Sequence, residues 1–192
     1  MNRQDGLCNT VRNYLCTFYC ILEEMISGMT EAVLSDSISH NFIVQMIPHH
    51  QGAIEMSKNI LKYTTNISLQ NIAAQIITEQ TKSIENMQKI LCTCGRQADA
   101  GQDLSVYQRR MDQIMHIMFS DMRCTYTSNR VDCNFMREMI PHHRGAVEMA
   151  STTLQYPICP ELNPILQAII TSQKRGILQM QSLLQCIGCQ AP

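Results

Sequence analysis

The chain contains the segment Phe42–Met56 and, 93 residues later, the similar segment Phe135–Met149. Ten of the fifteen aligned positions are identical, including the run Met-Ile-Pro-His-His. The likeness continues at the same offset, where Gln80 aligns with Gln173. Self-similarity over such a distance predicts one supersecondary unit that is present twice. Two such units would most simply pack about a pseudo-two-fold axis into a single helical bundle.

Helical periodicity dominates the chain, and no segments pair convincingly as strands. A polar link over residues 96–103 separates two halves, and Gly95 before it suits a helix C-cap. We therefore predict an all-α, up-and-down helical bundle built from two fused three-helix repeats. These repeats, residues 1–95 and 104–192, are expected to pack as one bundle. The six expected helices cover about residues 7–33, 40–62, 68–91, 104–122, 131–154 and 164–185.

Both histidines of the repeated motif fall on the helix face that is expected to be buried. With Met46 placed at 0° on a helical wheel, His49 lies at about 300° and His50 at about 40°. Glu55 falls on the opposite side. The thioether and the two imidazoles therefore share one face at i, i+3 and i+4. The second copy repeats this arrangement with Met139, His142 and His143.

Imidazoles on an apolar face are unfavourable unless their ring nitrogens find partners. Few polar side chains share this face, namely Ser57, Gln80, Gln173 and the other histidine pair. A metal ion would satisfy several nitrogens together, and a nearby thioether is a ligand that favours Cu(I). The alternative is a set of structural histidines that are satisfied by Gln, Ser or a backbone carbonyl.

The position of the motif along its helix sharpens the metal hypothesis. His50 lies about 15 Å along a helix of about 35 Å, and His143 lies at the matching place. If the two motif helices face each other antiparallel, the pairs meet near the middle of the bundle. That predicts a central site of up to four imidazoles flanked by Met46 and Met139.

Each motif also carries a proline, Pro48 or Pro141, inside the helical pattern. Proline removes one backbone hydrogen bond and usually kinks the helix. Because the apolar face runs through both motifs without a break, we expect kinked but continuous helices. The alternative is that each proline opens a new helix at its first turn.

The 192 residues include 14 methionines and 10 cysteines, and the net charge is −1. Scattered basic residues exclude an obvious nucleic-acid surface. The cysteines gather at the ends of the expected bundle, which favours disulfides between helix ends over thiolate metal sites or unpaired thiols. One end would hold Cys92, Cys94 and Cys159, and the other Cys8, Cys124, Cys133, Cys186 and Cys189.

Phe-x-x-x-Met-Ile-Pro-His-His-x-Gly-Ala-x-Glu-Met, followed about 25 residues later by Gln and then by Met, resembles the domain of unknown function 305 family. The resemblance covers about residues 36–92 and 129–186. It implies a ferritin-like helical bundle, and some family members are exported copper-binding proteins rich in Met and His. The family often carries an acidic residue where this chain has Ser83 and Gly176. The metal ligands that the resemblance implies are Met46, His49, His50, Met56 and Met87 in one half, and Met139, His142, His143, Met149 and Met180 in the other.

We therefore predict a protein that binds copper, or another transition metal, for sequestration or tolerance. The alternative is a metal-free helical scaffold or interaction module. No nucleophile with an evident base is present, which favours binding over catalysis. No apolar run approaches the about 20 residues of a membrane span. The start lacks the features of a secretory leader, which indicates a cytoplasmic protein, or an extracytoplasmic one if a leader preceded it. A homodimer is left open.

Overall fold

The computed structural model describes residues 6–94 and 98–189, and every regular element in these ranges is an α-helix. The expected boundaries agree with the structure to within three residues, and the all-α, up-and-down prediction is confirmed. The proposed cap at Gly95 lies outside the described residues. The helices are α1 (Asn9–Thr30), α2 (Ile38–Ile60), α3 (Ile67–Cys94), α4 (Gly101–Arg123), α5 (Val131–Thr153) and α6 (Leu162–Cys186).

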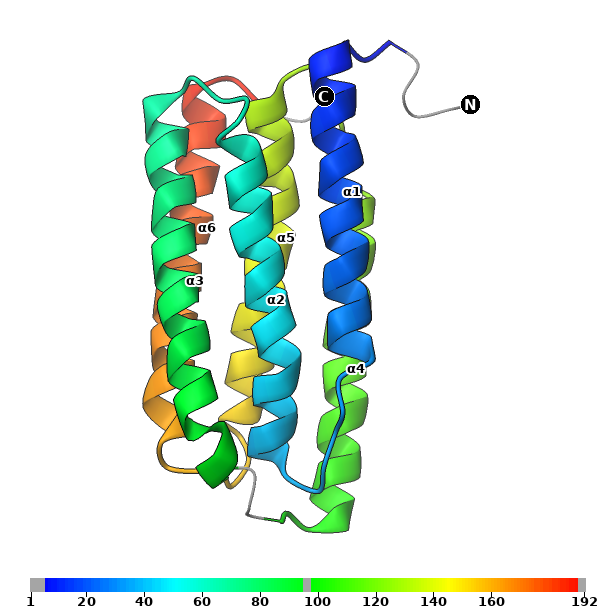
Figure 1. Cartoon of the computed structure of the whole chain (residues 1–192), viewed down its shortest axis with the longest axis vertical. Coiled ribbons are helices and arrows are strands. Elements are labelled where there is room, and N and C mark those ends of the chain that lie inside the picture. The colour runs from blue at the N-terminus through cyan, green and yellow to red at the C-terminus, as the bar shows by residue number, and fades with distance from the viewer. Residues whose placement is uncertain (1–5, 95–97, 190–192) are drawn as a thin grey trace.

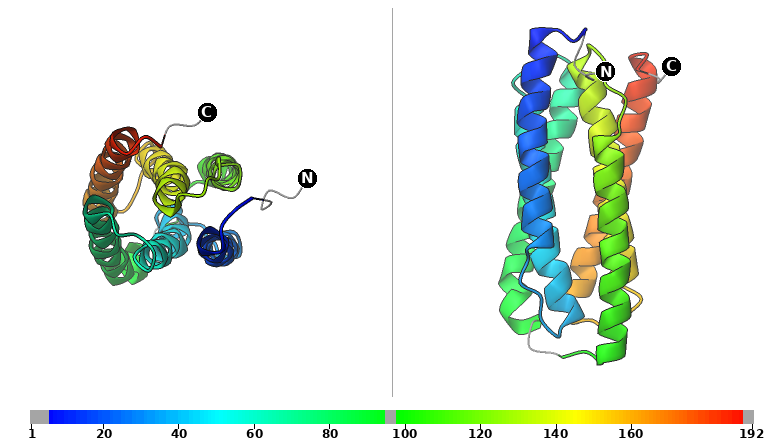
Figure 2. Two further views of the ribbon diagram at one scale, coloured as in Figure 1. Left: turned by 90° about the horizontal axis from the view of Figure 1, so that it is seen from above. Right: turned by 90° about the vertical axis from the view of Figure 1, so that its right-hand side faces the viewer.

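Four of the helices enclose the centre of the molecule, and two lie outside it. Helices α2, α3, α5 and α6 form a bundle in which α2 packs on α3 and α5, and α6 packs on α5 and α3. Helix α1 packs against α2, and α4 packs against α5, on the side away from α3 and α6 (Figures 1 and 2). Consequently α2 and α5, which carry the two motifs, have neighbours on more sides than the other helices.

The outer helices are amphipathic and bury a single stripe. In α1 this stripe contains Val11, Phe18 and Leu22, all at most 1% exposed. Matching asparagines in the first turns of α2 and α5 hold the loops before these helices. Asn41 accepts a hydrogen bond from the backbone of Ser35, and Asn134 likewise accepts one from the backbone of Ser128. Both amide groups also donate to the backbone oxygen of the same loop residue, so each loop is tied to its helix.

Both proline-containing helices are continuous, as expected, with Pro48 inside α2 and Pro141 inside α5. Glycines just after the histidine pairs allow the outer helices to approach closely. A Cβ atom at Gly52 would lie 2.8 Å from the sulfur of Met25, so no larger residue fits without a shift. Gly145 meets Met118 of α4 in the same way.

Disulfide bonds connect helix ends at both ends of the bundle, as the cysteine positions predicted. Cys94 at the end of α3 is bonded to Cys159 in the α5–α6 loop. Cys133 near the start of α5 is bonded to Cys189 after α6. In the part of the chain that is described, none of the helices combines the length and apolar character needed to span a bilayer.

Candidate metal centre

The four motif histidines meet in the interior where α2 faces α5. His49, His50, His142 and His143 are at most 2% exposed. The helical-wheel prediction of inward-facing rings is therefore correct. Glu55, predicted on the opposite face, is exposed and forms an ion pair with Lys58.

Reciprocal contacts join the two pairs across the α2–α5 interface. The ring nitrogen Nε2 of His49 lies 3.2 Å from the backbone oxygen of His142, and Nε2 of His142 lies 3.2 Å from the backbone oxygen of His49. The two rings stack with centroids 3.7 Å apart. Because a carbonyl oxygen can only accept, each Nε2 must carry the proton and donate it.

These hydrogen bonds set the tautomer of both rings. A neutral imidazole protonated at Nε2 has its lone pair on Nδ1, the form that binds a metal. Among the described residues, Nδ1 of His142 has no hydrogen-bond partner, and neither has Nδ1 of His143. A backbone carbonyl opposite the ligating nitrogen is the common partner of metal-binding histidines. The site therefore presents the oriented, unprotonated Nδ1 atoms of His49 and His142 to the interior.

The shortest ring separation crosses between the two pairs, whereas the two rings within each pair lie farther apart. Nδ1 of His49 lies 3.5 Å from Nδ1 of His50, and their ring centroids are 5.7 Å apart. The centroids of His142 and His143 are separated by 5.8 Å, at nearly the same interplanar angle. The described residues contain one group of three His, Cys, Asp or Glu ligand atoms within 4.8 Å of one another, and no histidine belongs to it. The four imidazoles thus form one cluster where α2 faces α5, and their ligation of a shared ion stays a prediction.

Burial keeps all four rings neutral. Loss of hydration lowers the pKa of His50 to about 3 and that of His142 to about 4. The pKa values of His49 and His143 also lie well below 6.5, first through burial and then through the neighbouring rings. Neutral imidazole is the metal-binding form, so no proton has to leave at neutral pH.

All six methionines implied by the family resemblance lie in the core, at most 1% exposed. Met46 precedes His49 and His50 by one helical turn on α2, and Met139 has the same place on α5. Met87 follows Ser83 by one turn on α3, and Met180 follows Gly176 by one turn on α6. Met56 and Met149 lie farther along, about 10 Å from the first histidine of each motif in the axial direction. The four nearer thioethers are therefore better placed than those of Met56 and Met149 to contact an ion beside the histidines.

A pocket of about 790 Å³ lies between α3 and α6 and reaches His50. Ser83 lines it, and its hydroxyl lies 3.1 Å from Nε2 of His50. Gln80 and Gln173 also line it, and Gln80 has no side-chain hydrogen-bond partner among the described residues. The expected partners Ser57, Gln80 and Gln173 thus do not bind the histidines, and Ser83 does. The pocket gives an ion a route from solvent to the histidines.

A buried carboxyl group beside the motif was not predicted from the sequence. Glu138 is 2% exposed and accepts a hydrogen bond of 2.6 Å from the hydroxyl of Tyr14. Burial raises the pKa of Glu138 to about 8, so this side chain is largely protonated at neutral pH. The helical wheel carried the signal, because Glu138 falls only about 40° from His142. The bond ties α1 to α5.

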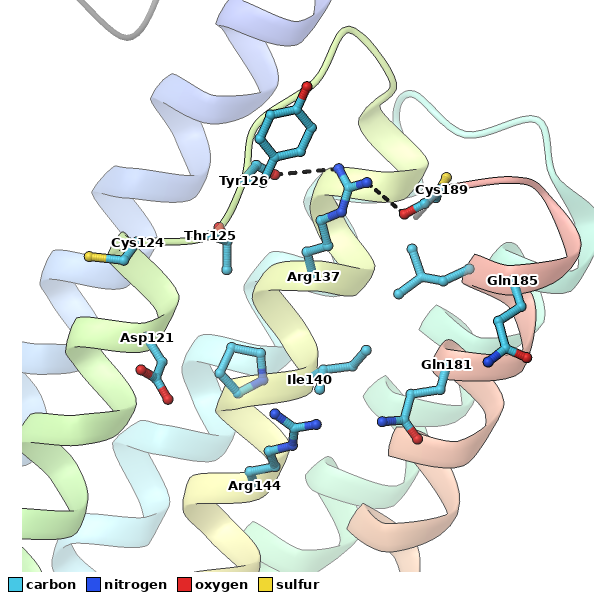
Figure 3. A pocket seen from close by; sticks show the side chains of 12 residues that line it. Asp121, Cys124, Thr125, Tyr126, Arg137, Ile140, Arg144, Gln181, Gln185 and Cys189 are labelled. Carbon is cyan, nitrogen blue, oxygen red and sulfur yellow. Dashed lines mark hydrogen bonds between the residues drawn. The ribbon is translucent and has the colours of Figure 1, made fainter. Parts of the chain in front are cut away.

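A second pocket, of about 720 Å³, lies between α4, α5 and α6 (Figure 3). Arg137 donates hydrogen bonds to the backbone oxygens of Tyr126 and Cys189, at 3.4 and 2.6 Å, and so holds the loop before α5 to the turn after α6. Arg144 lines the same pocket two helical turns further along α5. Because Pro141 forms part of the wall, this pocket begins one residue from His142.

The fold and this centre define a class: a six-helix, all-α bundle with two inward-facing histidine pairs on adjacent central helices. The chain belongs to the family described as "Domain of unknown function (DUF305)", which matches residues 39–184. No curated protein is significantly similar to it.

Solved structures of similar proteins agree with the family assignment. CopM in a silver-bound form is 30% identical with a TM-score of 0.57, and the match covers 77% of this chain and 94% of that one. CopM in a Cu(I)-bound form is 29% identical with a TM-score of 0.56, covering 80% and 97%. A DUF305 fragment from Deinococcus radiodurans, at 20% identity and a TM-score of 0.56, covers 80% and 97% and shares the fold.

Proposed function

We propose that this protein binds soft metal ions, copper in the first place, and that its role is sequestration or tolerance. The observation that carries the proposal is the pair of crossed hydrogen bonds between His49 and His142. They fix neutral rings whose Nδ1 lone pairs face the buried interior. Structures of the 29–30% identical protein CopM with Cu(I), Cu(II) and Ag support the choice of metal.

Each histidine pair binds its own ion in this proposal. Two nitrogens 3.5 Å apart, as in His49 and His50, subtend about 120° at an ion that is about 2.0 Å from each. That leaves room for a third, soft ligand. Met46 and Met87 supply this ligand at the first pair, and Met139 and Met180 supply it at the second. Met46 and Met139 lie one turn before their histidines on the same helix. Met87 and Met180 lie one turn after Ser83 and Gly176, which contact His50 and His143.

Met56 and Met149 are the remaining ligands that the family resemblance implies. Because they lie farther along the helix axis, Met56 and Met149 are better placed to bind a second soft metal ion than to coordinate the ion at the histidines. Thioethers favour Cu(I), whereas imidazole serves both oxidation states, so the set as a whole favours Cu(I) and tolerates Cu(II). Another transition metal that accepts imidazole is the alternative occupant.

We further propose that the two pairs belong to two fused repeats, residues 1–95 and 104–192, which pack as one bundle. The reciprocal bonds of His49 and His142 and the matching loop contacts of Asn41 and Asn134 support this division. It accounts for a family match that spans both motifs as one region.

Metal titration tests the proposal. Purified, chelator-treated protein is titrated with Ag(I), as a redox-stable stand-in for Cu(I), after the exposed thiols have been blocked by alkylation. We expect two equivalents per chain and a rise in melting temperature, because an ion bound only by the folded state stabilises it. The combined His49→Gln, His50→Gln, His142→Gln and His143→Gln variant should bind neither ion. Unchanged stoichiometry in that variant would refute the assignment.

A metal-free scaffold with structural histidines is the second candidate function. One observation favours it: Nε2 of His49, His142 and His50 already has a hydrogen-bond partner within the protein. This alternative predicts that the glutamine variants melt at a lower temperature but that Ag(I) or Cu(I) shifts the melting temperature of neither form. A melting temperature that metal raises in wild type, but not in the glutamine variants, would contradict this alternative.

A further inference from the structure

Three potential ligand atoms converge at the end of the bundle where α3 ends, well away from the histidines. The sulfurs of Cys94 and Cys159 and a carboxylate oxygen of Glu161 lie within 4.8 Å of one another. Both cysteines are buried, whereas Glu161 is exposed. Cys94 lies about 16 Å further along α3 than Ser83, which contacts His50. The cluster is therefore separate from the histidine centre, and the inference from it does not depend on the proposed function.

Hydrogen bonds to the N-cap and the first turn of α2 hold both cysteine backbones in place. The hydroxyl of Ser37 donates to the backbone oxygen of Cys94 at 3.2 Å. The backbone N–H of Cys159 donates to the hydroxyl of Ser39 at 3.0 Å. Because these bonds are independent of the sulfur atoms, they can keep the two side chains adjacent whether or not the sulfurs are bonded. Such a pair is a preorganised chelate.

The contact between Cys159 and Glu161 suits a thiol or a bound cation. The sulfur lies 2.9 Å from the carboxylate oxygen. A disulfide sulfur has no hydrogen to donate, so the carboxylate gains no hydrogen bond from it. A thiol can donate to this oxygen, and a cation can draw both atoms toward itself. The carboxylate also sits at the start of α6, whose N-terminal end attracts negative charge.

The remaining cysteines indicate that the protein is found under conditions in which thiols are stable. Six are exposed and without a disulfide bond, namely Cys8, Cys16, Cys20, Cys92, Cys124 and Cys186. Exposed free thiols persist under reducing conditions and are uncommon where disulfides form readily. The reduced form of the Cys94–Cys159 pair is therefore a relevant state of the molecule.

We propose that Cys94, Cys159 and Glu161 form a redox-controlled site for one thiophilic divalent ion such as Zn²⁺. A dithiol reductant supplies two electrons and two protons, breaks the Cys94–Cys159 bond and is itself oxidised to a disulfide. The ion then displaces the two thiol protons and takes two thiolates and one carboxylate, leaving a position for water or another ligand. Oxidation by a disulfide of higher potential reverses the exchange and releases the ion.

The second disulfide provides an internal control. Cys133 and Cys189 are bonded in the same way, but no carboxylate joins them in a three-ligand group within the described residues. The backbone oxygen of Cys189 accepts a hydrogen bond from the guanidinium group of Arg137 instead. A cation at this second pair would meet a positive side chain, so reduction alone should not create a comparable site there.

Cadmium titration tests the proposal, because thiolate coordination of Cd²⁺ produces an ultraviolet charge-transfer band. The background protein carries serine at the six exposed cysteines, so that only the two disulfide pairs respond. After reduction by a dithiol and its removal under argon, we expect one thiolate-bound Cd²⁺ per chain, and none before reduction. Glu161→Gln should weaken binding at least about tenfold. The Cys133→Ser, Cys189→Ser variant should bind as the background protein does.

Three outcomes would overturn the assignment. They are a charge-transfer band that survives in Cys94→Ser, Cys159→Ser; an affinity that Glu161→Gln leaves unchanged; and the absence of a band in the reduced background protein. Circular dichroism and thermal melting of each reduced variant establish that it is folded before the titration. If the Cys94→Ser, Cys159→Ser variant fails to fold, the Glu161→Gln variant still tests the proposed metal site, because the exposed side chain of Glu161 has no role in the core.

Discussion

The two histidine pairs have the same internal geometry but different neighbours on α3 and α6. Ring separations and angles agree closely, and the contacts across α2 and α5 are reciprocal. His50, however, meets the hydroxyl of Ser83, whereas the ring of His143 lies against Gly176, where a Cβ atom would be only 2.9 Å away. One ring is thus oriented by a hydrogen bond and the other by packing on a bare backbone. Equal motifs can therefore form unequal sites.

The surroundings of the two prolines differ in the same manner. Pro48 is half-buried and lies close to α1, since a Cβ atom at Gly28 would lie 2.8 Å from the proline ring. Pro141, with Asp121 at the place that matches Gly28, is buried and forms part of a pocket wall. Nearby, buried Glu138 on α5 occupies the place that Gln45 has on α2. The two motifs therefore differ in what surrounds their prolines and in which polar side chain is buried beside them.

The largest expected effect separates the two pairs. Replacing His49 and His50 by Gln should remove one bound equivalent of Ag(I) and leave the other, and replacing His142 and His143 should do the same. The reason is that each pair presents its own two nitrogens. Titration calorimetry of the thiol-blocked proteins measures the stoichiometry. If either double variant loses both equivalents, the pairs form one shared centre after all.

Acid should destabilise the metal-free protein through both pairs. The pKa values of the four buried rings are lowered, to about 3 for His50 and about 4 for His142, while the unfolded chain binds protons near 6.5. Between these values the unfolded state binds more protons, so the free energy of unfolding falls as pH drops below about 6.5. Melting temperatures from pH 7 to 4.5 measure this loss. In glutamine variants of either pair, the melting temperature should decline less steeply as the pH falls. An unchanged slope would contradict the lowered pKa values of the histidines.

Ser83→Ala should weaken the first site and leave the second unaffected. Removing the partner of a ligating histidine typically costs about 10–100-fold in metal affinity. We therefore expect one of the two Ag(I) dissociation constants to rise by this factor. Ser172→Ala is the matched control, since Ser172 lines the same pocket and donates only to the backbone oxygen of Ile169. If the two substitutions weaken metal binding equally, Ser83 has no specific role in the first site.

The packing of the prolines predicts a smaller difference in stability. Gly28→Val should lower the free energy of unfolding by about 1–3 kcal/mol, because the added atoms meet the ring of Pro48. Asp121→Val, at the matching place beside the pocket, should change it by no more than about 0.5 kcal/mol. Chemical denaturation gives both values. Equal losses would show that α1 and α4 approach their motifs alike.

Glu138→Gln should remove a loss of stability that wild type shows between about pH 4.5 and pH 8. The folded protein holds this carboxyl protonated up to a pKa of about 8, whereas the unfolded chain ionises near 4.5. The folded state therefore binds more protons in this range, and the stability of wild type declines as pH rises from about 4.5 to about 8 and then levels off. The glutamine variant should lack this part of the decline. Denaturation at pH 6 and pH 9 measures it, with exposed Glu55→Gln as the control that should follow wild type.

The helices, their boundaries and the inward direction of the histidines could be predicted because they depend on periodicity along one segment. Wheel positions placed His49, His50 and Glu55 correctly from local geometry alone. The partner of His50 could not be predicted, because Ser83 reaches it from α3 through the packing of two helices. The stacking of the His49 ring on the His142 ring could not be predicted either, since it depends on how closely α2 and α5 pack. Ligation by the named histidines and methionines stays a prediction.

By itself, the sequence determined that the chain forms amphipathic helices and that two motifs place paired imidazoles and a thioether on buried faces. Side-chain order along a helix follows from its fixed pitch, so these conclusions need no knowledge of the neighbours. Only the tertiary structure decided which carbonyl each ring contacts, which nitrogens remain free, and which cysteines meet a carboxylate. Those outcomes depend on distances between segments far apart in the chain, and such distances are set by how whole helices pack.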